Sequence, residues 1–140
     1  MKNQVWYIAL LIGLMCLIRF GLSIFGYATP QIFMKEIGIS LSSNPQMPYA
    51  IRAWAVRDMV ISILVVMSEK TIVKILLIGC VAIDFIDIIS AYLSGATGLI
   101  GTGDNYLLKL TSTAIACLIL ELGAIFLLFR EQIIEKAKKL

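Results

Sequence analysis

The sequence contains no histidine, and its three cysteines stand far apart. Without imidazole side chains, haem ligation by histidine and the usual zinc sites are excluded. Cys16, Cys80 and Cys117 form no CxxC pair and lie inside apolar runs. Small, buried packing residues are therefore a better interpretation of these cysteines than redox or metal chemistry. The sequence predicts no metal site and no cofactor.

Charged residues are also scarce, at 15% of the 140 residues, whereas 60% are hydrophobic. Soluble domains are about 45–50% apolar. A single domain over residues 1–140 could not bury such an excess in water, so the composition indicates an integral membrane protein. The formal net charge is only +3, and its basic residues gather at segment ends. That pattern orients a membrane protein and gives no support for nucleic-acid binding.

Four apolar runs are long enough, or nearly so, for the roughly 20 residues that cross a bilayer. They cover about residues 5–26, 49–67, 71–93 and 106–129. The first run follows Lys2 as a signal peptide would, but no small-x-small cleavage site follows it, so an uncleaved helix is expected. The fold class expected is all-α, a four-helix transmembrane bundle.

The connections between these runs differ in length. Only Ser68–Lys70 separates the second run from the third, which predicts antiparallel neighbours, with Ser68 capping the helix that follows. All three prolines lie between the first two runs. There, Thr29 as N-cap, Pro30 at the first helical position and Gly38 past the end predict a short helix over 30–37. That helix would rest on the membrane surface or cover the bundle as a lid. The glycine-rich 94–105 segment is expected to be a loop.

Lysine and arginine are distributed unequally between the two ends of the expected bundle. The end with the short turn and both termini has more of them than the opposite end. The positive-inside rule therefore places both termini in the cytoplasm, in a bacterial inner membrane or an equivalent. The basic residues of the first end are Lys2, Lys70, Lys74, Arg130, Lys136, Lys138 and Lys139, against Lys35, Lys109 and, at the border, Arg52.

Ionisable residues interrupt the apolar runs, where a charge costs several kcal/mol unless it is paired or hydrated. Such residues indicate a polar site inside the bundle. At about 1.5 Å per residue their depths fall into two layers. The outer layer contains Arg19, Arg52, Asp84 and Asp87, and the midplane layer contains Arg57, Asp58 and Glu121.

Helical phase predicts that these residues converge. Asp84 and Asp87 are three residues apart and share one helix face. Small residues share the face of Glu121, which indicates that Glu121 points into the bundle. Arg57 and Asp58 point about 100° apart, so both can line one broad cavity.

A purely structural interpretation competes with a functional one. Arg19 and Arg52 could extend to lipid headgroups as anchors, and Asp84 with Asp87 could simply neutralise them. Trp54 lies near an expected membrane interface, where tryptophan is a common anchor. Arg57 with Glu121 is harder to explain in this way, because greater depth makes the arrangement costlier.

Three classes of function remain. The first is an intramembrane enzyme that binds a lipophilic small molecule and isomerises it, cyclises it or opens an epoxide by acid–base chemistry. The second is a proton-coupled transporter or channel subunit, which with four helices requires a homo-oligomer. The third is a non-catalytic lipid-binding or assembly subunit. The carboxylates concentrate in the outer half and the midplane, which favours a pocket and hence the enzyme.

The enzyme hypothesis assigns a role to each residue. Two neighbouring carboxyl groups do not ionise equally, so Asp84 and Asp87 would form the acid–base pair. Asp58 and Glu121, with Arg57, would form the pocket floor as further candidate catalytic groups. The substrate would contact Arg19, Arg52, Arg57 and Trp54. Beyond that substrate, the expected partners are the lipid bilayer and a second copy of the chain.

The segment from Arg52 to Asp58, RAWAVRD, also resembles a known signature. It is similar to the arginine-x4-arginine-aspartate motif of small four-helix membrane proteins of unknown function that are allied with the DoxX-like group. In those families a later helix often carries acidic residues, as Asp84 and Asp87 do here. Ala55 replaces the glycine often found inside the motif. The resemblance implies the fold and the importance of Arg52, Arg57 and Asp58, and it implies no reaction.

Overall fold

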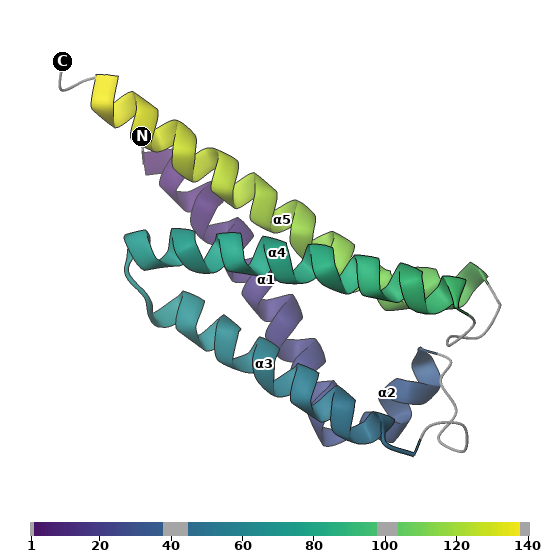
Figure 1. Ribbon diagram of the computed structural model, residues 1–140. Coiled ribbons are helices and arrows are strands. Elements are labelled where there is room, and N and C mark those ends of the chain that lie inside the picture. Colours follow the sequence, from purple (N-terminus) through teal and green to yellow (C-terminus); the bar gives the residue numbers. More distant parts are fainter. Residues whose placement is uncertain (1, 38–44, 98–103, 138–140) are drawn as a thin grey trace.

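The computed structural model describes residues 2–37, 45–97 and 104–137, and within these ranges the chain is all-α (Figure 1). The described residues form four long helices and one short one, and each predicted run lies within a long helix. Their bounds are α1 Lys2–Ala28, α2 Pro30–Glu36, α3 Met47–Met67, α4 Lys70–Ala96 and α5 Asp104–Ala137.

The two ends of the bundle differ in what they contain. The start of α1, the end of α5 and the turn between α3 and α4 lie at one end, and α2 lies at the other (Figure 1). As predicted, α3 and α4 are antiparallel. They nevertheless contact each other far less than α3 contacts α1 or α4 contacts α5, and α1 also packs on α5. The bundle is therefore two helix pairs joined through α1 and α5, with space left between α3 and α4.

One of the two predicted N-caps is wrong, that of Ser68, whereas Thr29 takes the predicted N-cap position of α2. Ser68 ends α3, and Glu69 takes the N-cap position of α4 without a side-chain hydrogen bond. Thr29 does precede Pro30 at the start of α2, but its hydroxyl donates to the carbonyl of Phe25 at 2.9 Å. Because Thr29 follows directly on α1, the carbonyl four residues back is already within its reach.

The predicted 94–105 loop is shorter than expected, because α4 continues to Ala96 and α5 begins at Asp104. The hydroxyls of Ser94 and Thr97 donate to carbonyls four residues back, which keeps this polar segment compatible with a helix end. Gly38, the expected stop of the short helix, lies outside the described residues.

The short helix α2 folds over the bundle, which is one of its two predicted placements. It packs on α1 and α3, and Met34 is almost fully buried. The ring of Phe33 lies 5.5 Å from that of Trp54 between centroids. Gly26 permits this packing, because a Cβ atom there would lie 3.3 Å from the Trp54 ring.

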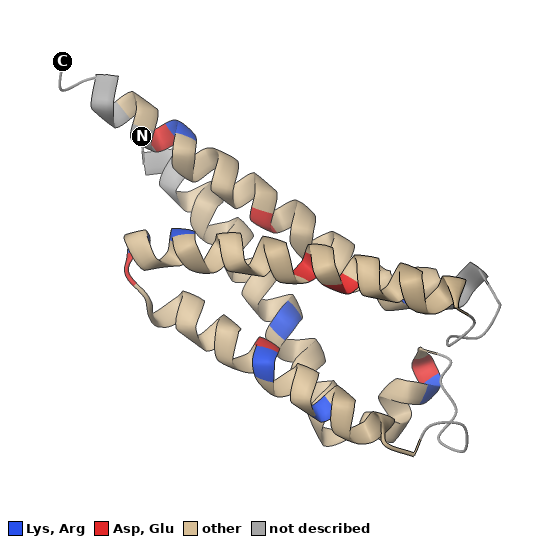
Figure 2. Cartoon of the chain, in the orientation of Figure 1, with Lys and Arg blue, Asp and Glu red and all other residues tan. Residues whose placement is uncertain are grey.

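The bundle exposes many large apolar side chains and buries several charged ones. Large apolar side chains are exposed on every long helix, including Leu17, Val60, Phe85 and Ile119. The acidic and basic segments of these helices lie near the middle of the bundle or at its ends (Figure 2). Within the described residues, two spans are long and apolar enough to cross a membrane, Trp6–Ala28 in α1 and Leu107–Glu131 in α5.

Candidate functional site

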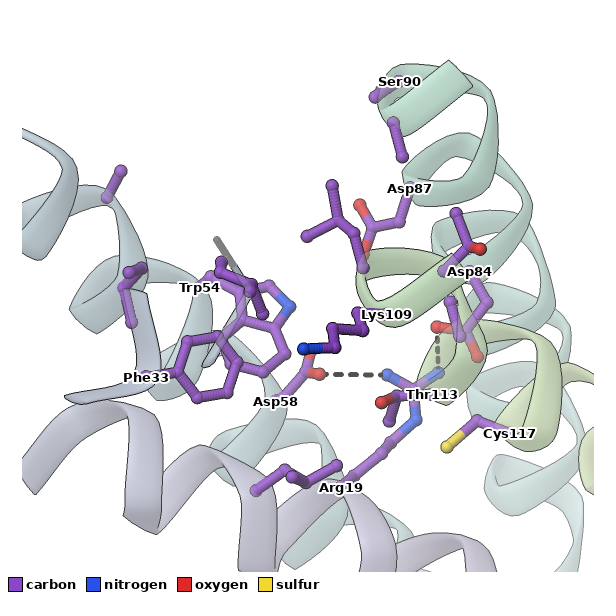
Figure 3. A pocket seen from close by; sticks show the side chains of 18 of the residues that line it. Arg19, Phe33, Trp54, Asp58, Asp84, Asp87, Ser90, Lys109, Thr113 and Cys117 are labelled. Atoms are coloured by element: carbon purple, nitrogen blue, oxygen red, sulfur yellow. Dashed lines mark ion pairs between the residues drawn. The ribbon is translucent and has the colours of Figure 1, made fainter. Parts of the chain in front are cut away.

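Arg19 on α1 lies at the meeting point of the four long helices. Its side chain is 2% exposed and contacts one carboxylate from each of the other three helices. Nη2 lies 2.6 Å from Asp84 on α4 and Nη1 lies 3.3 Å from Asp58 on α3 (Figure 3). Nη2 also lies 2.8 Å from Glu121 on α5. The Arg19 Nε also donates to Glu121 at 3.3 Å. The Arg19 guanidinium group therefore links α1 to α3, α4 and α5.

A second arginine extends this arrangement. Arg57 Nε lies 3.0 Å from Asp58 Oδ1, and its Nη2 lies 2.8 Å from Asp87 Oδ2. Each oxygen of Asp58 therefore faces a different guanidinium. We call the connected residues the charged network: Arg19, Arg57, Asp58, Asp84, Asp87 and Glu121.

The charged network contradicts the two separate layers expected from depth. Arg19 was expected to share the outer layer with Asp84, yet it also contacts Asp58 and Glu121 from the midplane layer. Counting residues from a helix end gives a position along that helix. It does not show that α1 crosses its neighbours at an angle (Figure 1). It also does not show how far a long arginine side chain extends from one layer to the other.

Arg52 is not part of the charged network. Its side chain is exposed, and its Nε donates to the backbone carbonyl of Tyr27 at 3.3 Å. It lies beside a small hollow of about 340 Å³ between the end of α1 and the start of α3. The predicted grouping of Arg52 with Asp84 and Asp87 has no ion pair to support it among the described residues.

A larger cavity of about 790 Å³ lies beside the charged network, with Arg19 and Asp58 at its base (Figure 3). Ligand pockets in proteins are roughly 300–1,000 Å³. The wall from α1, α2 and α3 is largely apolar and includes Leu22, Phe33, Ile51 and Trp54. The wall from α4 and α5 is polar and includes Asp84, Asp87, Ser90, Lys109 and Thr113. The cavity therefore suits an amphipathic molecule.

The predicted site residues divide by their relation to this cavity. Arg19, Asp58, Asp84, Asp87 and Trp54 line it. Glu121 is fully buried and pairs with Arg19, but neither Glu121 nor Arg57 is among the lining residues.

Sequence reasoning missed several residues of the polar wall. Ser90 and Ser94 follow Asp87 by three and seven residues, so helical spacing alone could have placed them on its face. The sequence contains no comparable signal for Lys109, which its charge marks only as a basic residue at the end of the bundle opposite the α3–α4 turn.

Some polar atoms of the site have no hydrogen-bond partner. Asp84 Oδ2, Glu121 Oε2 and Ser23 Oγ are buried without one among the described residues. Both carboxylates already use their other oxygen to face Arg19. Among the described residues, no group of three or more histidine, cysteine, aspartate or glutamate side chains is placed to bind a metal ion.

Comparison of the chain with protein-family models, curated proteins and solved structures finds no match. The resemblance of the Arg52–Asp58 segment to the DoxX-like group therefore stays a prediction.

Proposed function

We propose that this chain is a multi-pass membrane protein in which α1, α3, α4 and α5 each cross the bilayer. The apolar side chains exposed on all four helices support this proposal, because a monomer in water rarely exposes so much apolar surface. The burial of Arg19, Asp58, Asp84 and Glu121 supports it too, since intramembrane charges face the interior of a bundle. The basic residues near the α3–α4 turn favour cytoplasmic termini.

Cysteine labelling tests this topology. A variant with alanine at all three cysteines receives one new cysteine, at Glu36 on α2 or at Glu69 in the α3–α4 turn, both of which are exposed. In intact cells, a membrane-impermeant maleimide should label Glu36→Cys and should label Glu69→Cys only after permeabilisation. Equal labelling of both positions in intact cells would contradict the four-span topology.

We further propose that the protein is an enzyme that binds a lipophilic small molecule in the 790 Å³ cavity and acts on it by acid–base chemistry. The observation that carries this proposal is the placement of several carboxyl groups at one end of a cavity with an apolar, aromatic wall. Such a cavity buries the body of a lipophilic substrate and presents its reacting end to proton donors and acceptors.

The contacts favour Asp84 as the proton donor and Asp87 as the acceptor. Asp58 faces a guanidinium with each oxygen, so it acts as a structural partner. Asp84 lines the cavity, and its Oδ2 has no hydrogen-bond partner, so this oxygen can hold a proton. Asp87 is paired with Arg57 through one oxygen, and its side chain is 35% exposed and lines the cavity, so a molecule there can reach it.

These roles define the proton movements. Asp84 gives its proton to an oxygen or carbon of the substrate, and Asp87 removes a proton from the substrate or from an attacking water. Isomerisation, cyclisation and epoxide opening all require this pairing. Arg19 holds Asp84 in place and stabilises the carboxylate that remains after proton transfer.

A proton-coupled carrier has less support. On the terminal side of the charged network the described helices pack an apolar cluster that includes Met15, Val65, Leu77, Ala124 and Leu128. These residues separate the charged network from the end that contains the α3–α4 turn, so a proton would have to cross an apolar region.

Bulk introduced into the cavity tests whether it binds a molecule. Ala114 lines the cavity, whereas Ala116, two residues further on the same helix, is exposed and does not. We expect mass spectrometry of purified protein in its native lipids to find a small molecule bound to the wild type and to Ala116→Phe. Ala114→Phe should lose most of it, because its ring fills the space. Equal occupancy in both variants would contradict the proposal.

A further inference from the structure

We infer that the molecule held in the cavity carries a protonated amine beside its apolar body. This inference rests on the proposed function, because it names the chemical class of the ligand of the same cavity. It follows from three features: the charge balance of the charged network, the exposure of Asp87 to the cavity, and the aromatic wall opposite.

The charged network contains four carboxyl groups and two guanidinium groups, which gives a formal charge of −2 when all are ionised. An uncompensated charge inside a membrane bundle costs several kcal/mol. The proton proposed on Asp84 balances one of the two negative charges. A cation on the ligand would balance the other, and the cavity beside Asp84 and Asp87 has room for it.

The positive groups that line the cavity do not supply this balance. Every nitrogen of Arg19 that makes a contact faces a carboxylate of the charged network, and its side chain is 2% exposed. Lys109 also lines the cavity but is exposed, and among the described residues no ion pair joins it to a carboxylate. The base of the cavity is consequently negative.

Geometry also suits an ammonium group. Asp87 faces the cavity with a side chain that is 35% exposed, while Asp84 beside it is 3% exposed with one oxygen unpartnered. Across the cavity, Trp54 and Phe33 present aromatic rings close to Asp58 (Figure 3). Aromatic faces attract organic cations, and a carboxylate supplies the charge-assisted hydrogen bond. The apolar body of the ligand would lie along Leu22 and Ile51.

The chain offers its own reporter for a test. It has two tryptophans, and Trp6 is 61% exposed at the opposite end of α1 from the cavity. In Trp6→Phe, Trp54 is the single tryptophan, so its fluorescence reports on the cavity. The protein in nanodiscs of zwitterionic lipid is titrated with dodecylamine, dodecan-1-ol or dodecanoate. Empty nanodiscs give the amount of each probe that enters the lipid.

We expect dodecylamine to change Trp54 fluorescence at a concentration in the lipid about tenfold lower than the concentration that dodecan-1-ol requires. A tenfold difference in affinity is at the lower end of what a charge-assisted hydrogen bond provides. Dodecanoate should bind more weakly than either. Asp87→Asn should remove the preference for the amine, and Glu69→Gln, which neutralises a carboxylate in the distant turn, should retain it. The comparison of amine with alcohol needs no change in the charged network, so it stands even where Asp87→Asn fails to fold.

The possible results separate this inference from the proposed function. Equal binding of the alcohol and the amine overturns the inference but leaves a lipophilic pocket, with protons alone balancing the charged network. Preference for dodecanoate overturns the inference as well. No response to any probe, together with equal ligand occupancy in Ala114→Phe and Ala116→Phe, contradicts both.

Discussion

Replacing Arg19 by methionine is expected to leave little folded protein. The guanidinium is 2% exposed and is the contact that Asp58, Asp84 and Glu121 share. Methionine occupies a similar volume but leaves these carboxylates facing one another inside the bundle. Removing one partner of a buried ion pair costs about 3–5 kcal/mol, and here one side chain serves three pairs. Yield and monodispersity in size-exclusion chromatography, followed by thermal unfolding, measure the effect.

Arg52→Met is the matched control. It removes the same charge from an exposed side chain with one hydrogen bond, to the Tyr27 carbonyl, and should change the unfolding free energy by less than about 1 kcal/mol. Similar behaviour of Arg19→Met and Arg52→Met would show that the ion pairs of Arg19 do not stabilise the bundle.

A double variant separates the loss of charge balance from the loss of packing. Arg19→Met combined with Glu121→Gln removes the cation together with one of the carboxylates that it neutralises. Because the two side chains are in direct contact, their effects should not add, and the double variant should be more stable than Arg19→Met alone. A double variant less stable than either single variant would mean that packing around Arg19 matters more than charge.

The helices themselves could be predicted from the sequence, because long apolar runs between polar segments leave few alternatives. All four expected runs lie within long helices, and Pro30 begins the short helix as expected. Helix ends were less predictable. Ser68 and Thr29 both have side chains typical of N-caps, yet Ser68 precedes the cap position and Thr29 bonds back into α1. A serine or threonine hydroxyl can donate to a backbone carbonyl earlier in the chain or accept from a backbone amide later in the chain. Which of these bonds forms depends on the local backbone conformation.

The candidate site could be predicted in part. Spacing by three placed Asp84 and Asp87 on one face, and both line the cavity. The central place of Arg19 could not be predicted, because depth along a helix suggested an anchor near the outer interface. Its three ion pairs depend on how the helices cross, which the sequence does not encode locally. The cavity likewise depends on the separation of α3 from α4 and on the position of α2.

Asp84→Asn should abolish most turnover of the molecule that copurifies with the protein while leaving that molecule bound. Asparagine keeps the shape of the side chain and can still accept a hydrogen bond from Arg19, but it has no acidic proton to give. Loss of a general acid typically costs about 10²–10⁴-fold in rate. Single-turnover assays followed by mass spectrometry of the product measure it, with Glu69→Gln as a control for neutralising a carboxylate elsewhere.

Glu121→Gln distinguishes proton donation by Asp84 from a general effect of charge. It changes the other carboxyl group that contacts Nη2 of Arg19, but Glu121 lies outside the cavity lining. If Asp84 delivers the proton, Glu121→Gln should slow turnover much less than Asp84→Asn. Equal losses would mean that the rate depends on the charge around Arg19 and not on a proton from Asp84. Thermal unfolding of both variants controls for stability: the comparison of rates holds where Asp84→Asn and Glu121→Gln, which each change one carboxyl partner of Arg19, unfold at similar temperatures.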